Sequence, residues 1–161
     1  MPVKNSGGPA FLLAQVGAHA AAKFAERLAP LKLTPADAGI LRLLKLSPGI
    51  NQQDLSAKLA IHPSRLVGVL DVLEKRSLIE RRANAEDRRQ YSLHITERGN
   101  TLMQDLRRVA HEHQEQLLSA LAEQERELLG DLLRRIAQHQ GLTPGVHPGY
   151  RWMKPAGTNR E

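Results

Sequence analysis

Three arginines carry the clearest chemical signal in this chain of 161 residues. Arg65 lies at the start of a stretch with helical spacing, where a guanidinium group can form two hydrogen bonds to a guanine edge. Arg88 and Arg89 lie in a polar segment between two strand-like stretches, and a narrow, A·T-rich minor groove attracts arginines at such a tip. The neighbouring Asp87 can hold an arginine in one rotamer by pairing with it. These residues favour contact with duplex DNA.

Other side chains near these arginines suit the same partner. Ser64 lies in the first turn of the same predicted helix. Val67 can meet a thymine methyl group, and Gly68 allows close approach of the backbone. Gln52 and Gln53 lie at the N-terminus of the preceding predicted helix, a position that suits a phosphate. Ordinary solvation stays open as the role of each of these residues.

Two short helices and a hairpin are the elements that would position these side chains. Asn51 can cap the first helix, and Pro63 fits the first position of the second. Two capped helices separated by so few residues are typical of a helix-turn-helix. Strand-like stretches at 78–82 and 90–95 flank the arginine-bearing tip, which predicts a β-hairpin beside the second helix.

Longer helical patterns flank this unit at 10–30 and 96–140, with a break expected near 122–124. The stretch Thr34–Asp37 combines a capping threonine with proline and aspartate in the first turn, and it predicts a helix start. The flanking helices carry more apolar surface than a small lobe can cover, and exposing it costs roughly 25 cal/mol per Å². A second copy of the chain is the simplest cover, and a two-fold dimer would also face a palindrome.

The chain therefore divides into a DNA-binding lobe at 31–95 between dimerisation helices. Glycine and proline predict a flexible arm at 1–9 and a flexible tail at 141–161. Gln15 and His19 interrupt the apolar stretch near the N-terminus, which disfavours a signal peptide.

Composition excludes several classes of protein. The net charge of +6 favours an anionic partner, nucleic acid before membrane. The chain has no cysteine, which excludes disulfides and thiolate zinc sites, and no apolar run approaches the roughly 20 residues of a membrane span. Aromatic residues make up only 3%, which disfavours binding of single strands by base stacking.

Catalysis and metal binding are not expected. The sequence has no Ser-His-Asp order, no glycine-rich phosphate loop and no HExxH motif, so we predict no catalytic residue and no cofactor. His111 and His113 are two apart on a predicted helix and point to different sides, which argues against a metal site.

The segments from Leu33 to Gly99 also form a recognisable series. Asp87 and Arg89 form an Asp-x-Arg motif, which is followed after five residues by an apolar-Thr pair and then a glycine. With the other matching segments, this order resembles the MarR family of bacterial transcription regulators, over roughly residues 10–139. The matching segments are Leu33–Pro35, Leu55–Leu59, Leu73–Arg76, Asp87–Arg89 and Ile95–Gly99.

The resemblance implies a mainly α fold with a small β-hairpin wing, a winged helix-turn-helix with long N- and C-terminal dimerisation helices. It further implies a cytoplasmic, nucleoid-associated homodimer that represses transcription at pseudo-palindromic operators and is released by a small aromatic or phenolic anion. Arg89 would enter the minor groove, Asp87 would orient it and Arg88 would contact phosphate. The basic residues that would border the family's ligand cleft are His19, Lys23, Arg42, Arg107 and His111.

Three departures from the family pattern are visible. Ser77 stands where the family has glycine, so a left-handed helix cap should be costlier or absent. His62 replaces the usual Ser, Thr or Asp cap, and Val67 and Gly68 replace polar side chains. Two alternatives stay open: a winged-helix module that binds protein, and a structural DNA-binding dimer without an effector.

Overall fold

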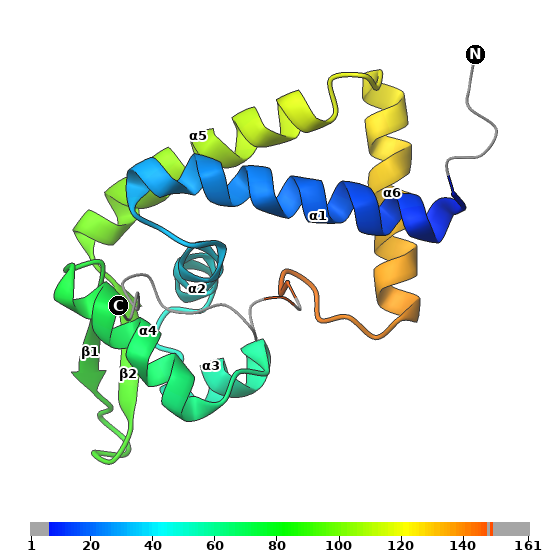
Figure 1. Ribbon diagram of the computed structural model, residues 1–161. Coiled ribbons are helices and arrows are strands. Elements are labelled where there is room, and N and C mark those ends of the chain that lie inside the picture. The colour runs from blue at the N-terminus through cyan, green and yellow to red at the C-terminus, as the bar shows by residue number, and fades with distance from the viewer. Residues whose placement is uncertain (1–6, 148, 150–161) are drawn as a thin grey trace, which may run out of the picture.

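A lobe of short helices and one hairpin, with long helices leading away from it, makes up the computed structural model (Figure 1). Residues 7–147 and 149 are described; residues 1–6 of the arm predicted at 1–9, and residues 148 and 150–161 of the tail predicted at 141–161, lie outside them. The predicted fold class, mainly α with a hairpin wing, is confirmed. The elements are α1 (Pro9–Leu28), the 3₁₀ helix η1 (Ala29–Leu31), α2 (Pro35–Leu46), α3 (Gln52–Leu59), α4 (Pro63–Lys75), β1 (Ile79–Ala83), β2 (Tyr91–Ile95), α5 (Glu97–Leu117) and α6 (Glu123–His139).

Helix α2 begins where the sequence predicts. The Thr34 hydroxyl accepts the amide of Asp37 at 3.2 Å, and the Asp37 carboxylate accepts the amide of Thr34 at 2.8 Å. This capping box satisfies two amides that a helix start leaves without partners. The core lies between α2, α3, α4 and the hairpin, which together form the lobe. Fully buried core residues include Leu41, Leu44, Leu55, Leu59, Leu66, Leu70, Leu73, Ile79 and Leu93.

The hairpin strands are antiparallel, with Ile79 opposite Ile95 and Ala83 opposite Tyr91. The predicted first strand, 78–82, begins one residue too early. The amide of Leu78 donates to Leu73 O of α4 at 3.0 Å, so it closes the preceding helix and is not available to the strand ladder.

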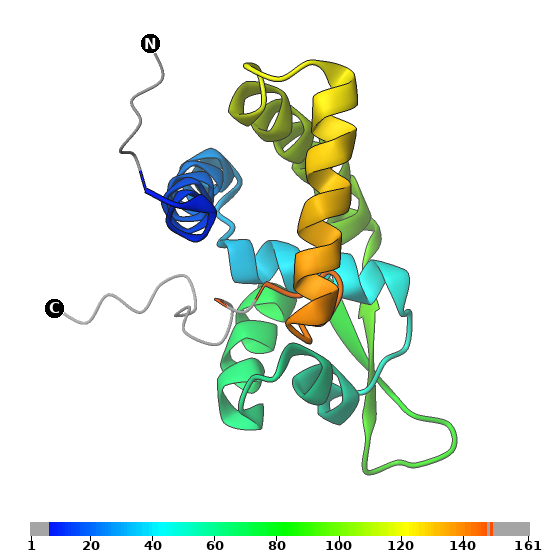
Figure 2. The same cartoon turned by 90° about the vertical axis from the view of Figure 1, so that its right-hand side faces the viewer.

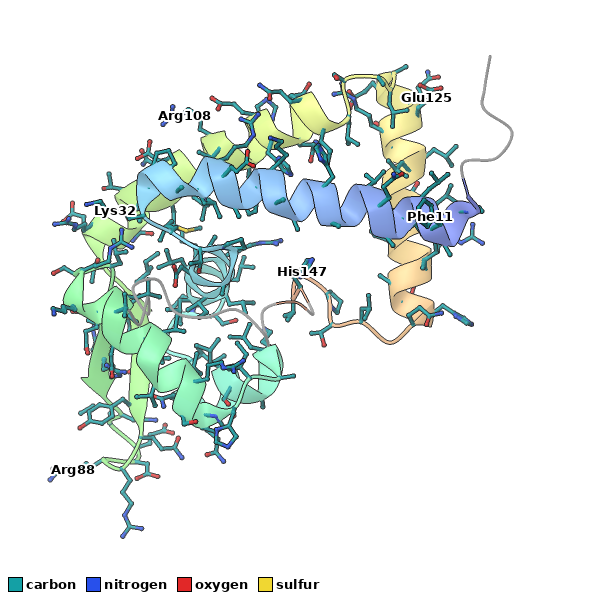
Figure 3. All side chains as sticks on the ribbon, viewed as in Figure 1. Phe11, Lys32, Arg88, Arg108, Glu125 and His147 are labelled. Atoms are coloured by element: carbon teal, nitrogen blue, oxygen red, sulfur yellow. The ribbon has the colours of Figure 1, made fainter. Side chains whose placement is uncertain are left out.

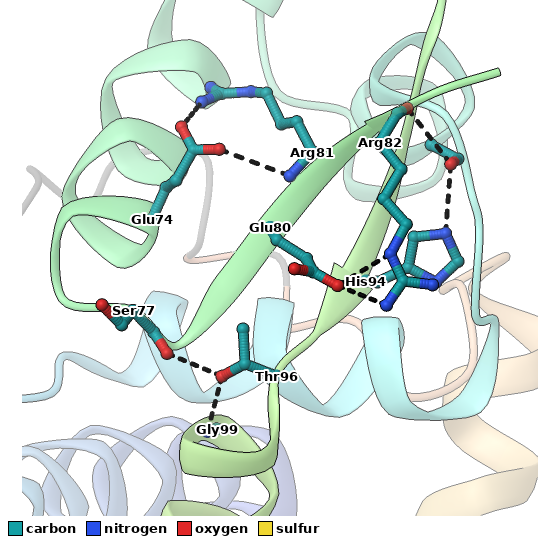
Figure 4. Close-up of polar contacts among 9 residues, drawn as sticks. Glu74, Ser77, Glu80, Arg81, Arg82, His94, Thr96 and Gly99 are labelled. Atoms are coloured by element: carbon teal, nitrogen blue, oxygen red, sulfur yellow. Dashed lines mark hydrogen bonds and ion pairs between the residues drawn. The ribbon is translucent and has the colours of Figure 1, made fainter.

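A left-handed residue ends α4, although the sequence disfavours it there. Ser77 has φ +57°, so of the two alternatives expected, a costlier cap or no cap, the structure shows that the left-handed cap is present. The amide of Ser77 donates to Glu74 O at 2.8 Å, and its carbonyl accepts the Thr96 hydroxyl at 2.6 Å. Thr96 also caps α5 by accepting the amide of Gly99 at 3.0 Å (Figure 4). These hydrogen bonds offset the cost of a Cβ in the left-handed region.

Arg76 joins the end of α4 to the connection between α1 and α2. Its guanidinium donates to Lys32 O at 2.6 Å and to Leu31 O at 3.1 Å. Lys32 itself is left-handed, with φ +54°. The position of α4 is therefore tied to the end of the long first helix.

The turn from α5 to α6 is built around one arginine. The Nε of Arg126 donates to Leu118 O at 3.2 Å and to Leu121 O at 3.1 Å, while Nη1 pairs with Glu115 at 2.9 Å. Since these bonds occupy the carbonyls after α5, the long helix ends at Leu117, earlier than the break expected near 122–124. Figure 2 shows α6 standing apart from α1, and no residue of α6 is buried.

Candidate nucleic-acid interface

The exposed face of α4 carries the predicted base-reading residues. Its opposite face is buried through Leu66, Leu70 and other core residues, so the amphipathic pattern fixes which side looks outward. Ser64 and Arg65 are exposed in the first turn, and Val67 is 37% exposed. Gly68, half-buried, lies on the same helix.

The N-cap residue of α4 is His62. His62 Nδ1 lies 2.7 Å from the Ser64 hydroxyl and accepts the Ser64 amide at 3.3 Å. Its carbonyl accepts the amide of Leu66 at 3.1 Å. A histidine therefore performs the capping role at the position where the family pattern has Ser, Thr or Asp.

Helix α3 places its two glutamines beside its N-terminus. Asn51 caps the helix by accepting the amide of Asp54 at 2.7 Å. Gln52 is half-buried and Gln53 is exposed. Both positions lie in the first turn, where helix amides and the helix dipole favour an anion such as phosphate.

The tip of the hairpin is ordered by hydrogen bonds within it. The amide of Asn84 donates to Gln90 O at 3.0 Å, and Asp87 Oδ1 accepts the amide of Arg89 at 2.9 Å. The sequence predicts that Asp87 pairs with an arginine side chain, whereas the structure has it binding the backbone of Arg89. Asp87 thus shapes the turn, and Arg88 projects from the tip into solvent (Figure 3).

These features lie on one side of the lobe. In Figures 1 and 2 the start of α4, the start of α3 and the hairpin tip all lie at the bottom of the molecule, away from α1 and α5. Arg65 and the tip arginines are exposed there. A helix start and an arginine-tipped hairpin on the same side suit the major groove and the adjacent minor groove of one duplex.

The five predicted ligand-cleft residues are not gathered around the large groove of this chain. That groove, about 780 Å³, lies between α1, α5 and α6. None of the five lines it, and all five are exposed. They lie on three different helices: His19 and Lys23 on α1, Arg42 on α2, and Arg107 and His111 on α5.

The groove contains instead a histidine that is not among the five predicted ligand-cleft residues. His113 lines it together with Phe24, and the two rings lie 5.3 Å apart, centre to centre. The signal was present in the sequence, since His113 follows Met103, Leu106 and Ala110 at steps of three or four residues. His111 falls outside that series.

The environment of His113 lowers its pKa. Burial contributes most, followed by the positive charge of Arg27 and then by His19. Burial acts in this direction because it disfavours the charged imidazolium. The charged, imidazolium form of His113 is therefore disfavoured in the folded protein.

Acidification should destabilise the protein through His113. Its folded pKa lies below the ordinary value of 6.5, so the unfolded chain binds the proton more readily. The stability that comes from keeping His113 uncharged is fully present above about pH 6.5, and it is lost as the pH falls from there through the folded pKa. We expect the melting temperature of His113→Gln to depend less on pH than that of the natural chain, over about pH 7.5 to 5.5, at fixed protein concentration. The exposed His111→Gln is the control, and equal pH slopes for all three proteins would contradict the assignment.

The structure also bears on two other classes of protein, those that span a membrane and those that hold a metal ion. Within residues 7–147 and 149, no helix has the length and apolarity to cross a bilayer. In the same residues, no three side chains of His, Cys, Asp or Glu come close enough to hold a metal ion.

Known proteins resemble this chain in both sequence and fold. Residues 33–91 match the model of the MarR family. A protein of Thauera aromatica, described as a transcriptional regulatory protein for the hcr operon, is 30% identical over 112 residues, which cover 70% of this chain and 68% of that one. The transcriptional repressor CouR, solved with a 23-mer DNA duplex, has a TM-score of 0.73 and 30% identity, covering 81% of this chain and 92% of its own. A MarR family protein of Mycobacterium tuberculosis, solved with salicylic acid, has a TM-score of 0.66 and 25% identity, covering 82% and 98%.

Proposed function

Because this chain belongs to the MarR family of DNA-binding transcription regulators, we propose that it acts as a dimeric repressor of a pseudo-palindromic operator. One observation carries the proposal: the first turn of α4 and the arginine-tipped hairpin lie on the same side of the lobe. Arg65 would bind a base edge in the major groove, while Arg89 would enter the minor groove. Arg88 and the start of α3 would contact phosphates.

A dimer follows from the surface of α1 and α6. Leu128, Leu132 and Ile136 recur every four residues on α6, and the groove beside α5 does not include them. This side of α6 faces away from its own chain. Large apolar side chains of α1, among them Phe11 and Val16, are also exposed. Contact with a second copy would remove both surfaces from water and give the operator two recognition helices.

The release signal in this proposal is a small aromatic or phenolic anion. Support comes from the relative solved with salicylic acid. Phe24 and His113 offer an aromatic side chain and an imidazole in the groove between the long helices. The arginines that line this groove, and could pair with the carboxylate or phenolate there, are Arg126 and Arg134. The residues predicted for this role from the sequence lie outside the groove: His19, Lys23, Arg42, Arg107 and His111.

Substituting the two key arginines tests the DNA contact. Arg65→Ala and Arg89→Ala should each weaken operator binding by roughly 5- to 150-fold per half-site, since a good arginine contact contributes about 1–3 kcal/mol. Arg88→Ala, which would remove a proposed phosphate contact, should reduce the slope of log K against log salt by about 0.9. The measurement is a fluorescence titration with the inverted repeat nearest the gene. Arg108→Ala is the control, because Figure 3 places Arg108 on the far side of the molecule.

Two outcomes would favour the alternatives. DNA affinity unchanged by both arginine substitutions would favour a winged-helix module that binds protein. Affinity for random duplex equal to that for the inverted repeat, at matched salt, would favour a structural DNA-binding dimer.

A further inference from the structure

The hairpin is attached to the lobe along both of its strands. On the β2 side, the amide of Gly49 donates to Leu93 O at 3.0 Å and the amide of Leu93 donates to Ile50 O at 2.9 Å. Together with an isolated β-bridge between Asn51 and Ser92, these backbone bonds attach the segment before α3 to β2. On the β1 side, the attachment to α4 includes the side chain of Arg81.

Arg81 holds two carboxylates of α4 at once. Its Nη2 lies 2.6 Å from Asp71 Oδ1. Its Nη1 pairs with Glu74 Oε2, and its backbone amide donates to Glu74 Oε1 at 3.3 Å; Figure 4 shows both contacts with Glu74. Asp71 and Glu74 are three residues apart and so share one face of α4. The Arg81 side chain is only 16% exposed. A guanidinium group that is itself largely shielded from solvent and pairs with two carboxylates has a preferred geometry, although the Asp71 and Glu74 side chains are 60% and 41% exposed.

The next residue provides a natural contrast. Arg82 points to the other face of the strand and is 59% exposed. Its side chain pairs with Glu80 of the same strand, with Nε at 2.7 Å, and therefore does not link the strand to α4 (Figure 4). Arg81 and Arg82, although adjacent in the chain, therefore have different structural roles.

We propose that Arg81 is a positioning residue for DNA binding, which sets the wing at the distance from α4 that both grooves require. The inference depends on the proposed contacts of Arg65 and Arg89. A hairpin with strands of five residues is about 17 Å long, so a swing of about 10° at its base moves the tip by roughly 3 Å. Such a shift is as large as a hydrogen bond is long. A two-stranded hairpin has little stability of its own, so its anchorage determines where its tip lies.

A second role of Arg81 must be separated from this one. Without its guanidinium, Asp71 and Glu74 would face each other and the DNA phosphates as unpaired charges. The triple variant Arg81→Met, Asp71→Asn, Glu74→Gln removes the clamp and leaves no such charges. Positioning predicts that the triple variant binds as weakly as Arg81→Met, whereas charge neutralisation predicts full recovery.

The deciding experiment is a double-mutant cycle with the wing arginine, measured as operator affinity of the full chain. We expect Arg81→Met to weaken binding about 10-fold in the natural background and less than about 2-fold in the Arg89→Ala background, because the wing contact is then already lost. Arg81→Lys, which can reach one carboxylate only, should fall between. Arg82→Met is the matched control and should change affinity less than about 2-fold. Additive losses, or recovery in the triple variant, would overturn the proposal.

Amide hydrogen exchange of the free protein gives an independent measurement. Arg81→Met should speed exchange in β1 and β2 while Arg82→Met leaves it unchanged, and the urea midpoints of both variants report whether the fold is retained. If Arg89→Ala alone leaves affinity unchanged, the proposed wing contact fails. The exchange data then still decide whether Arg81 anchors the hairpin, and unchanged exchange in Arg81→Met would refute it.

Discussion

Replacing Leu132 and Ile136 together by aspartate is expected to weaken operator binding by at least about 100-fold and to convert the dimer into single chains. The two side chains are 43% and 46% exposed, one turn apart on the side of α6 that faces away from its own groove. In a two-fold dimer the substitution would bury four carboxylates without partners. Each such group costs more than about 1 kcal/mol, so the sum exceeds the roughly 3 kcal/mol that a 100-fold change requires.

The substituted surface belongs to α6, which has no buried residue, so the lobe should still fold. Sedimentation velocity gives the mass in solution, and circular dichroism tests whether the helices remain. Gln138→Asp adds a carboxylate at an exposed α6 position that lines neither hollow beside the helix, and it should leave the dimer intact. A double variant that still sediments at twice the chain mass would place the interface elsewhere.

Parts of the fold that depend on neighbours in sequence were predictable. The capping box of Thr34 and Asp37 needs only two side chains three residues apart, and the start of α4 at Pro63 needs only the geometry of proline. Amphipathic spacing likewise identified the buried face of α4. In each case a single segment contains both the cause and the structural result.

Features that depend on distant residues were not predictable in the same way. Ser77 adopts a left-handed conformation, and its carbonyl accepts a hydrogen bond from the hydroxyl of Thr96, 19 residues later in the chain. The different roles of Arg81 and Arg82 depend on which face of the hairpin meets α4. Sequence spacing alone distinguishes the two faces but does not say which one is covered.

The predicted site residues show the same difference between features set by neighbouring residues and features set by distant ones. The predicted DNA-binding residues come from three short elements, α3, α4 and the hairpin tip, which lie on one side of the lobe. The ligand-cleft residues come from three helices, and the structure does not bring them around the large groove. Which side chains line a cleft between long helices depends on the rotation of each helix about its own axis. A resemblance to other proteins does not specify that rotation.

Gly99→Ala is expected to reduce the free energy of unfolding by about 3 kcal/mol. A Cβ at this position would overlap the carbonyl oxygen of Leu78 and lie 2.6 Å from Cγ1 of Ile95. Both neighbours are constrained: Leu78 O accepts the amide of Thr96 at 3.1 Å, and Ile95 ends the ladder of β2. Neither can withdraw without breaking a backbone hydrogen bond or moving α5 from the hairpin. Alanine favours a helix more than glycine does, so the expected loss comes from steric overlap alone.

A second glycine in a helix provides the control with the opposite sign. A Cβ at Gly130 would come no nearer than 3.5 Å to the guanidinium of Arg134, an ordinary contact with a flexible group. Gly130→Ala should therefore stabilise α6 by up to about 1 kcal/mol. Urea unfolding followed by circular dichroism, at one fixed protein concentration, measures both changes. Because the first turn of α5 packs against the end of α4 through Leu78, Gly99→Ala should also weaken operator binding. Normal stability of this variant would show that α5 can move away from the hairpin freely. The close packing at Gly99 would then not hold the long helices to the DNA-binding surface.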